Sequence, residues 1–179
     1  VLGLRNILII GAGRSATSLI KYLLDKSEKE DLFITIGDLS IESAQKFSNG
    51  HPNAKGIKLD VFDAPQRSQA IKFSDIVISM LPARFHIEVA KDCILYKKHL
   101  VTASYVSDEM QALDEDAKVN GLVFMNEIGV DPGIDHMSAM QVIDRIRDAG
   151  GIILMFESFT GGLIAPESDN NLWHYKFTW

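Results

Sequence analysis

The stretch 6-NILIIGAGRSA-16 decides the fold, because it joins a run of apolar strand-forming residues to a glycine motif. The motif fits the pattern G-x-G-x-x-A, and residues 15–26 after it have helical spacing. Gly11 permits a tight turn, Gly13 lets the backbone approach a pyrophosphate, and Ala16 lets the helix pack closely on the strand. The N–H groups at the start of that helix favour phosphate binding. The stretch therefore predicts the first strand and helix of a dinucleotide-binding domain.

Asp38 supports this interpretation, because it follows the next apolar run, 32-LFITIG-37. A carboxylate at the end of the second strand suits the ribose hydroxyls of adenosine and would repel a 2′-phosphate. Asp38 therefore predicts NAD rather than NADP as the cofactor. The alternative is an ordinary glycine turn, with Asp38 capping the following helix.

Apolar runs and helical patterns alternate along most of the chain. Strands are predicted at 6–10, 32–37, 56–61, 76–81, 99–103 and 122–128, and helices at 15–26, 41–48, 64–73, 84–96 and 107–120. The strands are apolar on both faces, which indicates a parallel sheet covered by helices on both sides. Right-handed crossovers then favour an α/β fold of the doubly wound Rossmann type. A further helix at 137–148 and a strand at 152–159 are predicted beyond it.

Composition excludes several classes of protein. The 179 residues are 46% hydrophobic, and 24 acidic against 18 basic residues give a net charge of −6, which argues against nucleic-acid and anionic-membrane partners. No run approaches the roughly 18 apolar residues of a membrane span, and no signal peptide is evident, so we expect a cytoplasmic protein.

Cys93 is the one cysteine of the sequence, which excludes an internal disulfide and a cysteine-rich metal site and predicts a buried structural thiol. The aromatic cluster at 173–179 would expose apolar surface by itself, so we expect the chain to be a piece of a longer protein.

Two loops after predicted strands are expected to line the ligand crevice. Asp60 and Val61 follow the third strand and would flank the adenine. The segment 79-SMLPARFH-86, with Leu81, follows the fourth strand at the point where strand order reverses, where α/β folds bind ligands. The alternative is a plain strand-to-helix connection, and His86 in its helix is expected to be structural.

Four blocks of irregular composition resemble saccharopine dehydrogenases of the L-glutamate-forming type, also called saccharopine reductases. They are 75-DIVISMLPARFH-86, 101-VTASYVS-107, 127-EIGVDPGIDHM-137 and 161-GGLIAPESDNN-171, the last followed by 175-YKFTW-179. The resemblance covers nearly the whole chain. It implies a Rossmann domain at 1–133 and, at 134–179, the start of a mixed α/β substrate domain that also forms homodimers.

The resemblance also implies site residues, matched position by position. Cofactor contacts would fall on Gly11, Ala12, Gly13, Arg14, Ser15, Ile36, Gly37, Asp38, Asp60, Val61, Leu81, Ala103, Ser104, Val130, Asp131 and Pro132. Substrate contacts would fall on Ser104, Tyr105 and Asp131, and Asp131 and Tyr105 are the candidate catalytic residues. Thr160 stands where many members have a cysteine near the active site, so that cysteine cannot be the acid or base here. In having Asp38 after the second predicted strand, the chain resembles the NAD-using branch of the family.

The acidic turn 129-GVDPGIDH-136 lies after the sixth predicted strand, beside 103-ASY-105, where the nicotinamide should bind. The turn also has an ordinary structural explanation, because Asp, Pro and Gly, the types of residues 131–133, are among those that favour tight turns. Asp135 and His136 are expected to be structural. Glu127, on the predicted strand, is either a buried carboxylate with its partners satisfied or a residue that orients a neighbour.

The function inferred is NAD-dependent oxidation of saccharopine to L-glutamate and 2-aminoadipate 6-semialdehyde, a step of lysine metabolism, with no metal ion. Saccharopine carries several carboxylates, whereas this acidic chain offers few convergent cations apart from Arg84. We therefore expect arginines from the rest of the substrate domain to bind the carboxylates. The alternatives are a related reductase of another carboxyalkyl amine, such as carboxynorspermidine, and a dinucleotide-binding module without activity.

Overall fold

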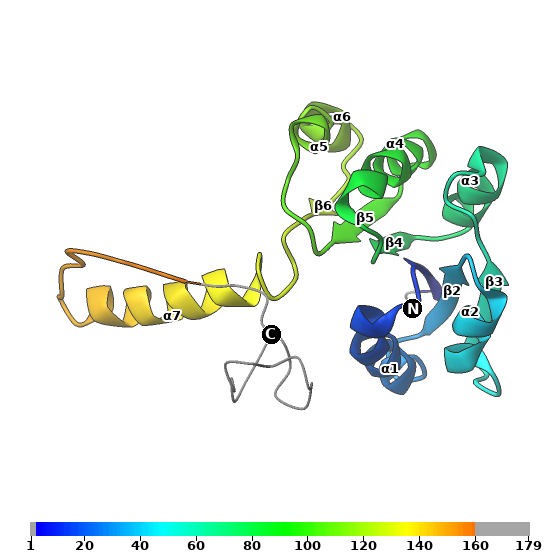
Figure 1. Ribbon diagram of the computed structural model, residues 1–179, viewed down its shortest axis with the longest axis horizontal. Coiled ribbons are helices and arrows are strands. Elements are labelled where there is room, and N and C mark those ends of the chain that lie inside the picture. Colours follow the sequence, from blue (N-terminus) through cyan, green and yellow to red (C-terminus); the bar gives the residue numbers. More distant parts are fainter. Residues whose placement is uncertain (1–2, 160–179) are drawn as a thin grey trace, which may run out of the picture. The chain divides into compact units, whose positions relative to one another are not determined.

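Six parallel strands form a single sheet in the computed structural model, which describes residues 3–159. The strands are β1 (Arg5–Ile10), β2 (Leu32–Asp38), β3 (Ala54–Lys58), β4 (Ile76–Ser79), β5 (His99–Thr102) and β6 (Phe124–Met125). Their order is β3-β2-β1-β4-β5-β6, and every neighbouring pair is parallel. The order reverses between β1 and β4, so the switch point of a doubly wound fold lies there (Figure 1). The predicted fold class is confirmed.

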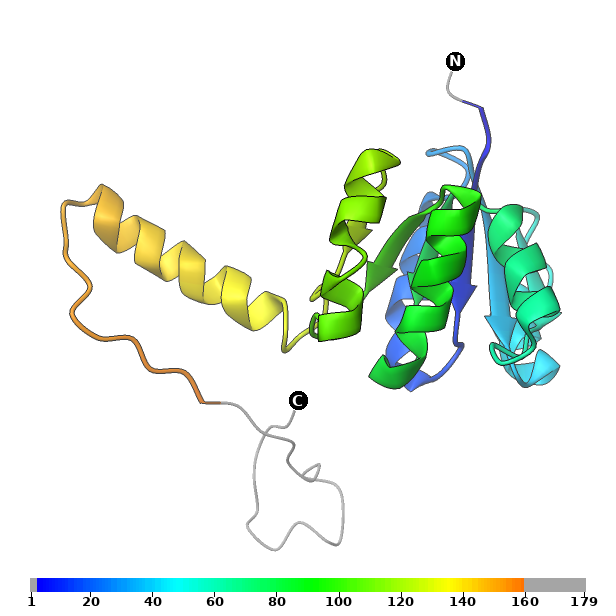
Figure 2. The ribbon, with the colours of Figure 1, turned by 90° about the horizontal axis from the view of Figure 1, so that it is seen from above.

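Helices connect the strands and cover both faces of the sheet. They are η1 (Arg14–Ala16), α1 (Thr17–Lys26), α2 (Ile41–Ser48), α3 (Ala64–Lys72), η2 (Ala83–Phe85), α4 (His86–Tyr96), α5 (Asp108–Gln111) and α6 (Asp114–Val119). In Figure 2 the green helix α4 is in front of the sheet and the blue helix α1 is behind it. None of the helices in residues 3–159 is both long enough and apolar enough to cross a membrane.

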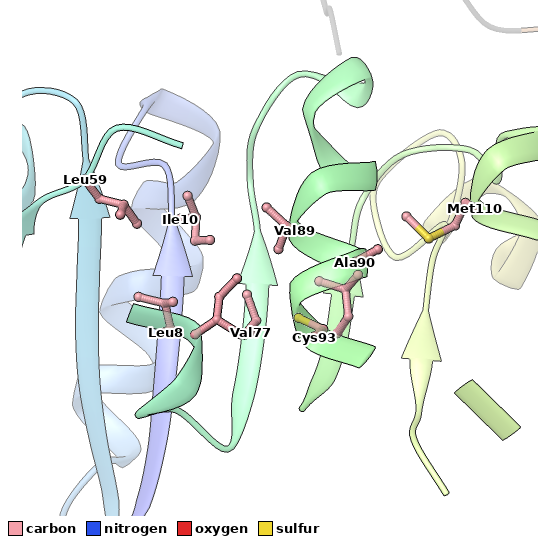
Figure 3. Packing of buried hydrophobic residues seen from close by; sticks show 10 residues of the cluster. Leu8, Ile10, Leu59, Val77, Val89, Ala90, Cys93 and Met110 are labelled. Atoms are coloured by element: carbon pink, nitrogen blue, oxygen red, sulfur yellow. The ribbon is translucent and has the colours of Figure 1, made fainter. Parts of the chain in front are cut away.

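The central strand β1 contributes to two separate cores because successive side chains point to opposite faces. Ile7 and Ile9 pack with Ile20 of α1 on one face. Leu8 and Ile10 pack on the other face with residues of α3 and α4, a cluster that Figure 3 shows from close by. Cys93 belongs to this second cluster and is fully buried, as predicted.

The strand predicted at 56–61 is β3, which runs from Ala54 to Lys58, and three other predicted elements differ more from the structure. The predicted strand 122–128 is only β6, because the backbone of Glu127 turns left-handed (φ 62°) and leaves the sheet. The predicted helix 107–120 is divided into α5 and α6, because Leu113 N–H bonds to Met110 O three residues back and interrupts the α-helical pattern. Residues 152–159 form no strand, since nothing in the described chain makes ladder hydrogen bonds with them.

The chain divides into two compact units, Val1–Ile134 and Asp135–Trp179. The second unit contains nearly all of α7 (Ile134–Asp148), which begins three residues before the predicted helix. The domain boundary inferred from the resemblance, between residues 133 and 134, stays a prediction. Thr160 and the aromatic cluster at 173–179 lie outside the described residues.

Candidate functional site

The carboxyl ends of the parallel strands bring the predicted site residues to one edge of the sheet. The glycine loop follows β1, Asp38 ends β2, the segment from Met80 to Phe85 follows β4, and residues 103–107 follow β5. In an α/β sheet, this edge beside the switch point is where ligands bind. The predicted residues form two groups here, one beside the glycine loop and one beside the end of β5.

The glycine loop has the conformation that its sequence predicts. Gly11 has φ +104°, and a Cβ atom there would lie 3.1 Å from the carbonyl oxygen of Met80, so only glycine fits. Gly13 has ordinary backbone angles, and a Cβ atom there would meet nothing within 4 Å. Exposed Arg14 and Ser15 begin η1, which has no side-chain cap, so its first N–H groups are left for a ligand.

Asp38 is fixed against the glycine loop by two backbone hydrogen bonds. Its Oδ2 accepts the N–H of Ala12 at 2.8 Å and its Oδ1 accepts the N–H of Ser40 at 2.9 Å. Each carboxylate oxygen retains a lone pair for a ligand hydroxyl. The helix-capping alternative is wrong, because Ser40 caps α2 by accepting the N–H of Ser43 at 3.1 Å.

A cleft of about 190 Å³ adjoins Asp38. Its walls include predicted residues, namely Gly11, Gly37, Asp38, Asp60, Val61, Leu81 and Phe85 of the segment 79–86, and the unpredicted Leu39 and Phe62. The Phe62 and Phe85 rings meet edge to face with their centroids 4.9 Å apart. Arg67 Nη1 donates to the carbonyl oxygen of Val61 at 2.5 Å and so fixes this wall. An apolar cleft beside a carboxylate is suited to an adenosine.

The structure explains why Ile36 and Gly37 occupy the end of β2. The Ile36 side chain is fully buried in the core, so it can offer a cofactor only its main chain. A Cβ atom on Gly37 would lie 2.7 Å from Leu59 Cδ2, so glycine lets these two strand ends approach closely.

A second cleft, of about 370 Å³, lies beside the end of β5. Arg84, His86, Tyr105 and Asn126 are among its lining residues. Tyr105, which lines this cleft, also contacts the other candidate catalytic residue, because its hydroxyl donates to Asp131 Oδ1 at 2.5 Å. A proton can therefore pass between a phenol and a carboxylate at this point.

The turn that carries Asp131 is tightly closed. The N–H of Gly129 donates to Pro132 O at 2.8 Å, and a Cβ atom on Gly133, which has φ +144°, would lie 2.3 Å from Gly129 O. Val130 and Asp131 are exposed at its tip, Pro132 is buried, and the Asp131-Pro132 peptide is cis. The glycines therefore set the backbone of the turn, and the hydrogen bond from Tyr105 orients the Asp131 side chain.

Other loop residues have clear hydrogen-bond roles. Half-buried Glu127 lies beyond β6, not on a strand as predicted. Its Oε1 accepts the N–H of Val106 at 3.1 Å, which supports the alternative that Glu127 orients a neighbour.

In the second unit, His136 Nδ1 lies 2.8 Å from Asp135 Oδ1. No group of three metal-binding side chains is found within residues 3–159.

His86 is buried and bridges two serines. Its Nδ1 lies 2.8 Å from Ser79 Oγ at the end of β4, and its Nε2 lies 2.8 Å from Ser104 Oγ after β5. Burial lowers the pKa of its imidazole, which therefore stays neutral near pH 7. Sequence reasoning missed this bridge, because nothing in the spacing of these residues indicates the contact between His86 and Ser104. It also missed Phe62, although an aromatic residue in the loop after a predicted β-strand was a usable signal.

The fold, the glycine loop and the carboxylate at the end of β2 define a Rossmann-type domain that binds a pyridine nucleotide. Two family models match the chain: the saccharopine dehydrogenase NADP binding domain over residues 7–125 and the saccharopine dehydrogenase C-terminal domain over residues 129–179. The chain belongs to the saccharopine dehydrogenase family. The resemblance inferred from its sequence blocks is thereby confirmed.

Similar proteins support the same assignment. A saccharopine dehydrogenase of Schizosaccharomyces pombe, whose name specifies NADP(+) and L-glutamate formation, is 42% identical over 174 residues, which are 97% of this chain and 38% of that protein. The alpha-aminoadipic semialdehyde synthase of Arabidopsis thaliana is 38% identical over 97% of this chain and 18% of its own length. The apo structure of saccharopine dehydrogenase (L-Glu forming) from Saccharomyces cerevisiae matches with a TM-score of 0.83 and 37% identity, over 98% of this chain and 38% of that one. The chain therefore spans well under half the length of these relatives.

Proposed function

We propose that the protein to which this chain belongs oxidises saccharopine to L-glutamate and 2-aminoadipate 6-semialdehyde with a pyridine nucleotide. One observation carries the proposal: the hydrogen bond between Tyr105 and Asp131 at the carboxyl edge of the sheet, beside the expected nicotinamide. Support also comes from the relatives, whose names specify saccharopine and L-glutamate formation.

The chemistry divides between the cofactor and the side chains of this chain. The nucleotide, when bound, accepts a hydride from the carbon on the lysine side of the secondary amine. Asp131, with Tyr105, accepts one proton of the protonated secondary amine and passes it to solvent, so that loss of the hydride leaves an iminium ion. The same pair then takes a proton from the water that attacks the iminium carbon. Returning that proton to the nitrogen and accepting the proton of the new hydroxyl breaks the carbon–nitrogen bond and releases glutamate and the aldehyde.

We propose NAD as the preferred cofactor. Asp38 supports NAD, since a fixed carboxylate accepts ribose hydroxyls and repels a 2′-phosphate. The names of the family domain and of the Schizosaccharomyces pombe relative point to NADP instead. If NADP is bound, the exposed Arg14 of the adjoining glycine loop is the cation that would pair with its 2′-phosphate.

The substrate carboxylates are proposed to bind cations from the part of the protein beyond this chain. Arg84 is the one lysine or arginine that lines the second cleft among the described residues, whereas saccharopine has several carboxylates. We also propose a homodimer, formed through that further part, and a cytoplasmic location.

The catalytic assignment is tested with the full-length natural protein and two substitutions. Tyr105→Phe and Asp131→Asn should each lower kcat by about 100-fold or more, the usual scale of a lost acid–base group, and Tyr105→Phe should leave cofactor binding nearly unchanged. Asp108→Asn, on the exposed start of α5, is the matched carboxylate control. If Asp131→Asn keeps the kcat of the control, Asp131 is not the base.

A further inference from the structure

The bridge Ser79–His86–Ser104 joins the buried end of β4 to the loop that carries Tyr105. His86 is 4% exposed and Ser79 is 0% exposed, so water does not satisfy their polar atoms. The two contacts are both 2.8 Å, a normal length for hydrogen bonds of this type. Ser104 is only half-buried and is the member of the bridge that a ligand can reach.

The burial of Ser79 determines the direction of these hydrogen bonds. Within the described chain, His86 Nδ1 is the hydrogen-bond partner that the structure gives to Ser79 Oγ. A buried hydroxyl hydrogen without an acceptor is unfavourable, so Ser79 donates and Nδ1 accepts. Since a neutral imidazole has one N–H, the proton of His86 is then on Nε2, which donates to Ser104 Oγ.

This direction has a consequence for Ser104. Its oxygen receives a hydrogen bond from His86, and its own O–H hydrogen is therefore available to another acceptor. We propose that His86 is a positioning residue that makes Ser104 a hydrogen-bond donor to a carbonyl-type oxygen of the bound ligand. That oxygen is either the carboxamide oxygen of the nicotinamide or a carboxylate oxygen of the substrate.

The opposite direction would give a different site. If Nδ1 carried the proton, Nε2 would accept from Ser104, and the serine could only accept from a ligand N–H. His86 thus determines which kind of ligand atom Ser104 recognises. The identity of the ligand in this inference rests on the proposed function. The tautomer of His86 is inferred from the hydrogen bonds of the bridge alone.

The first test is the tautomer in the full-length natural protein. Proton–nitrogen correlation spectra of protein with nitrogen-15-labelled histidine distinguish the two ring nitrogens, and His86→Asn identifies the signal by its loss. We expect protonated Nε2 and unprotonated Nδ1. Protonated Nδ1 in the wild type would overturn the proposal, and this result does not depend on any substrate.

The second test is a double-mutant cycle. The Oδ1 of His86→Asn can still accept from Ser79, but its short side chain cannot reach Ser104. We expect about a tenfold loss, the scale of one hydrogen bond, in NADH affinity if the acceptor is the carboxamide, or in the KM for saccharopine if it is the carboxylate. The loss should vanish when Ser104→Ala is already present, whereas a purely structural effect of His86 would persist.

Two further variants complete the test. His86→Gln can still donate from its Nε2 to Ser104 and should recover most of the loss, while His51→Asn, on the loop before β3, is the matched histidine control. If His86→Asn behaves like the His51→Asn control, or if its loss is unchanged in the Ser104→Ala background, the proposal is wrong. A wild-type protein that binds NADH but does not oxidise saccharopine would remove the proposed function and leave the tautomer and NADH tests valid.

Discussion

Gly13→Ala should separate stability from cofactor binding. The backbone angles of Gly13 (φ −72°, ψ −178°) suit any residue, and a Cβ atom there would meet nothing within 4 Å. The substitution should therefore stabilise the protein by about 0.4–1 kcal/mol through the unfolded chain. The same methyl group fills the space through which the backbone would approach a pyrophosphate. Losing one charge-assisted hydrogen bond, about 1.5–3 kcal/mol, weakens binding by roughly 10- to 150-fold.

The assay combines urea unfolding with NADH titration of the full-length protein. Gly3→Ala is the control, because its Cβ atom would also lie in open space, at the other end of β1. Gly11→Ala gives the contrast: its left-handed backbone angle should make it less stable by about 1–2 kcal/mol. Wild-type NADH affinity in Gly13→Ala would refute the claim that the phosphates approach this glycine.

Three further outcomes are expected. Asp92→Ala removes the nearer carboxylate partner of the buried Arg67, whose Nε lies 2.8 Å from Asp92 Oδ2, and leaves it only the half-exposed Glu88 at 3.8 Å. The substitution should lower the free energy of unfolding in urea by up to about 3–5 kcal/mol; a loss under 1 kcal/mol would show that the pair is not desolvated. Burial raises the pKa of the Cys93 thiol, so alkylation followed by peptide mass spectrometry should detect no modification before unfolding, and rapid modification of folded protein would contradict this. Burial lowers the pKa of the His86 imidazole in the folded protein, so below about pH 6.5 the unfolded chain binds more protons than the folded one. The free energy of unfolding, measured in urea, should therefore decrease below that pH in the wild type and decrease less in His86→Gln. The same pH dependence in both proteins would contradict this expectation.

Local sequence signals predicted the central part of the fold. The alternation of apolar runs with helical patterns predicted the parallel sheet, and the segment from Asn6 to Ala16 predicted the first strand, the turn and the helix. The physical reason is that each of these features depends on adjacent residues: glycine angles, side-chain size and helix periodicity. Asp38 was predicted to end the second strand for the same reason.

The errors arose where structure depends on distant partners. The segment 152–159 has strand-like composition, but a strand exists only when another strand pairs with it. The left-handed turn at Glu127 shortens β6, and its residue type gives no such signal. The contacts of His86 with both serines depend on how two strand ends meet, which the linear spacing does not reveal.

The most direct test of the proposed reaction is NADH formation by the full-length natural protein with saccharopine, measured beside NADP and a control without substrate. We expect turnover that depends on saccharopine and is faster with NAD than with NADP. Faster turnover with NADP would refute the role given to Asp38 and leave the reaction intact. A protein that binds either nucleotide but never oxidises saccharopine would contradict the proposed function itself.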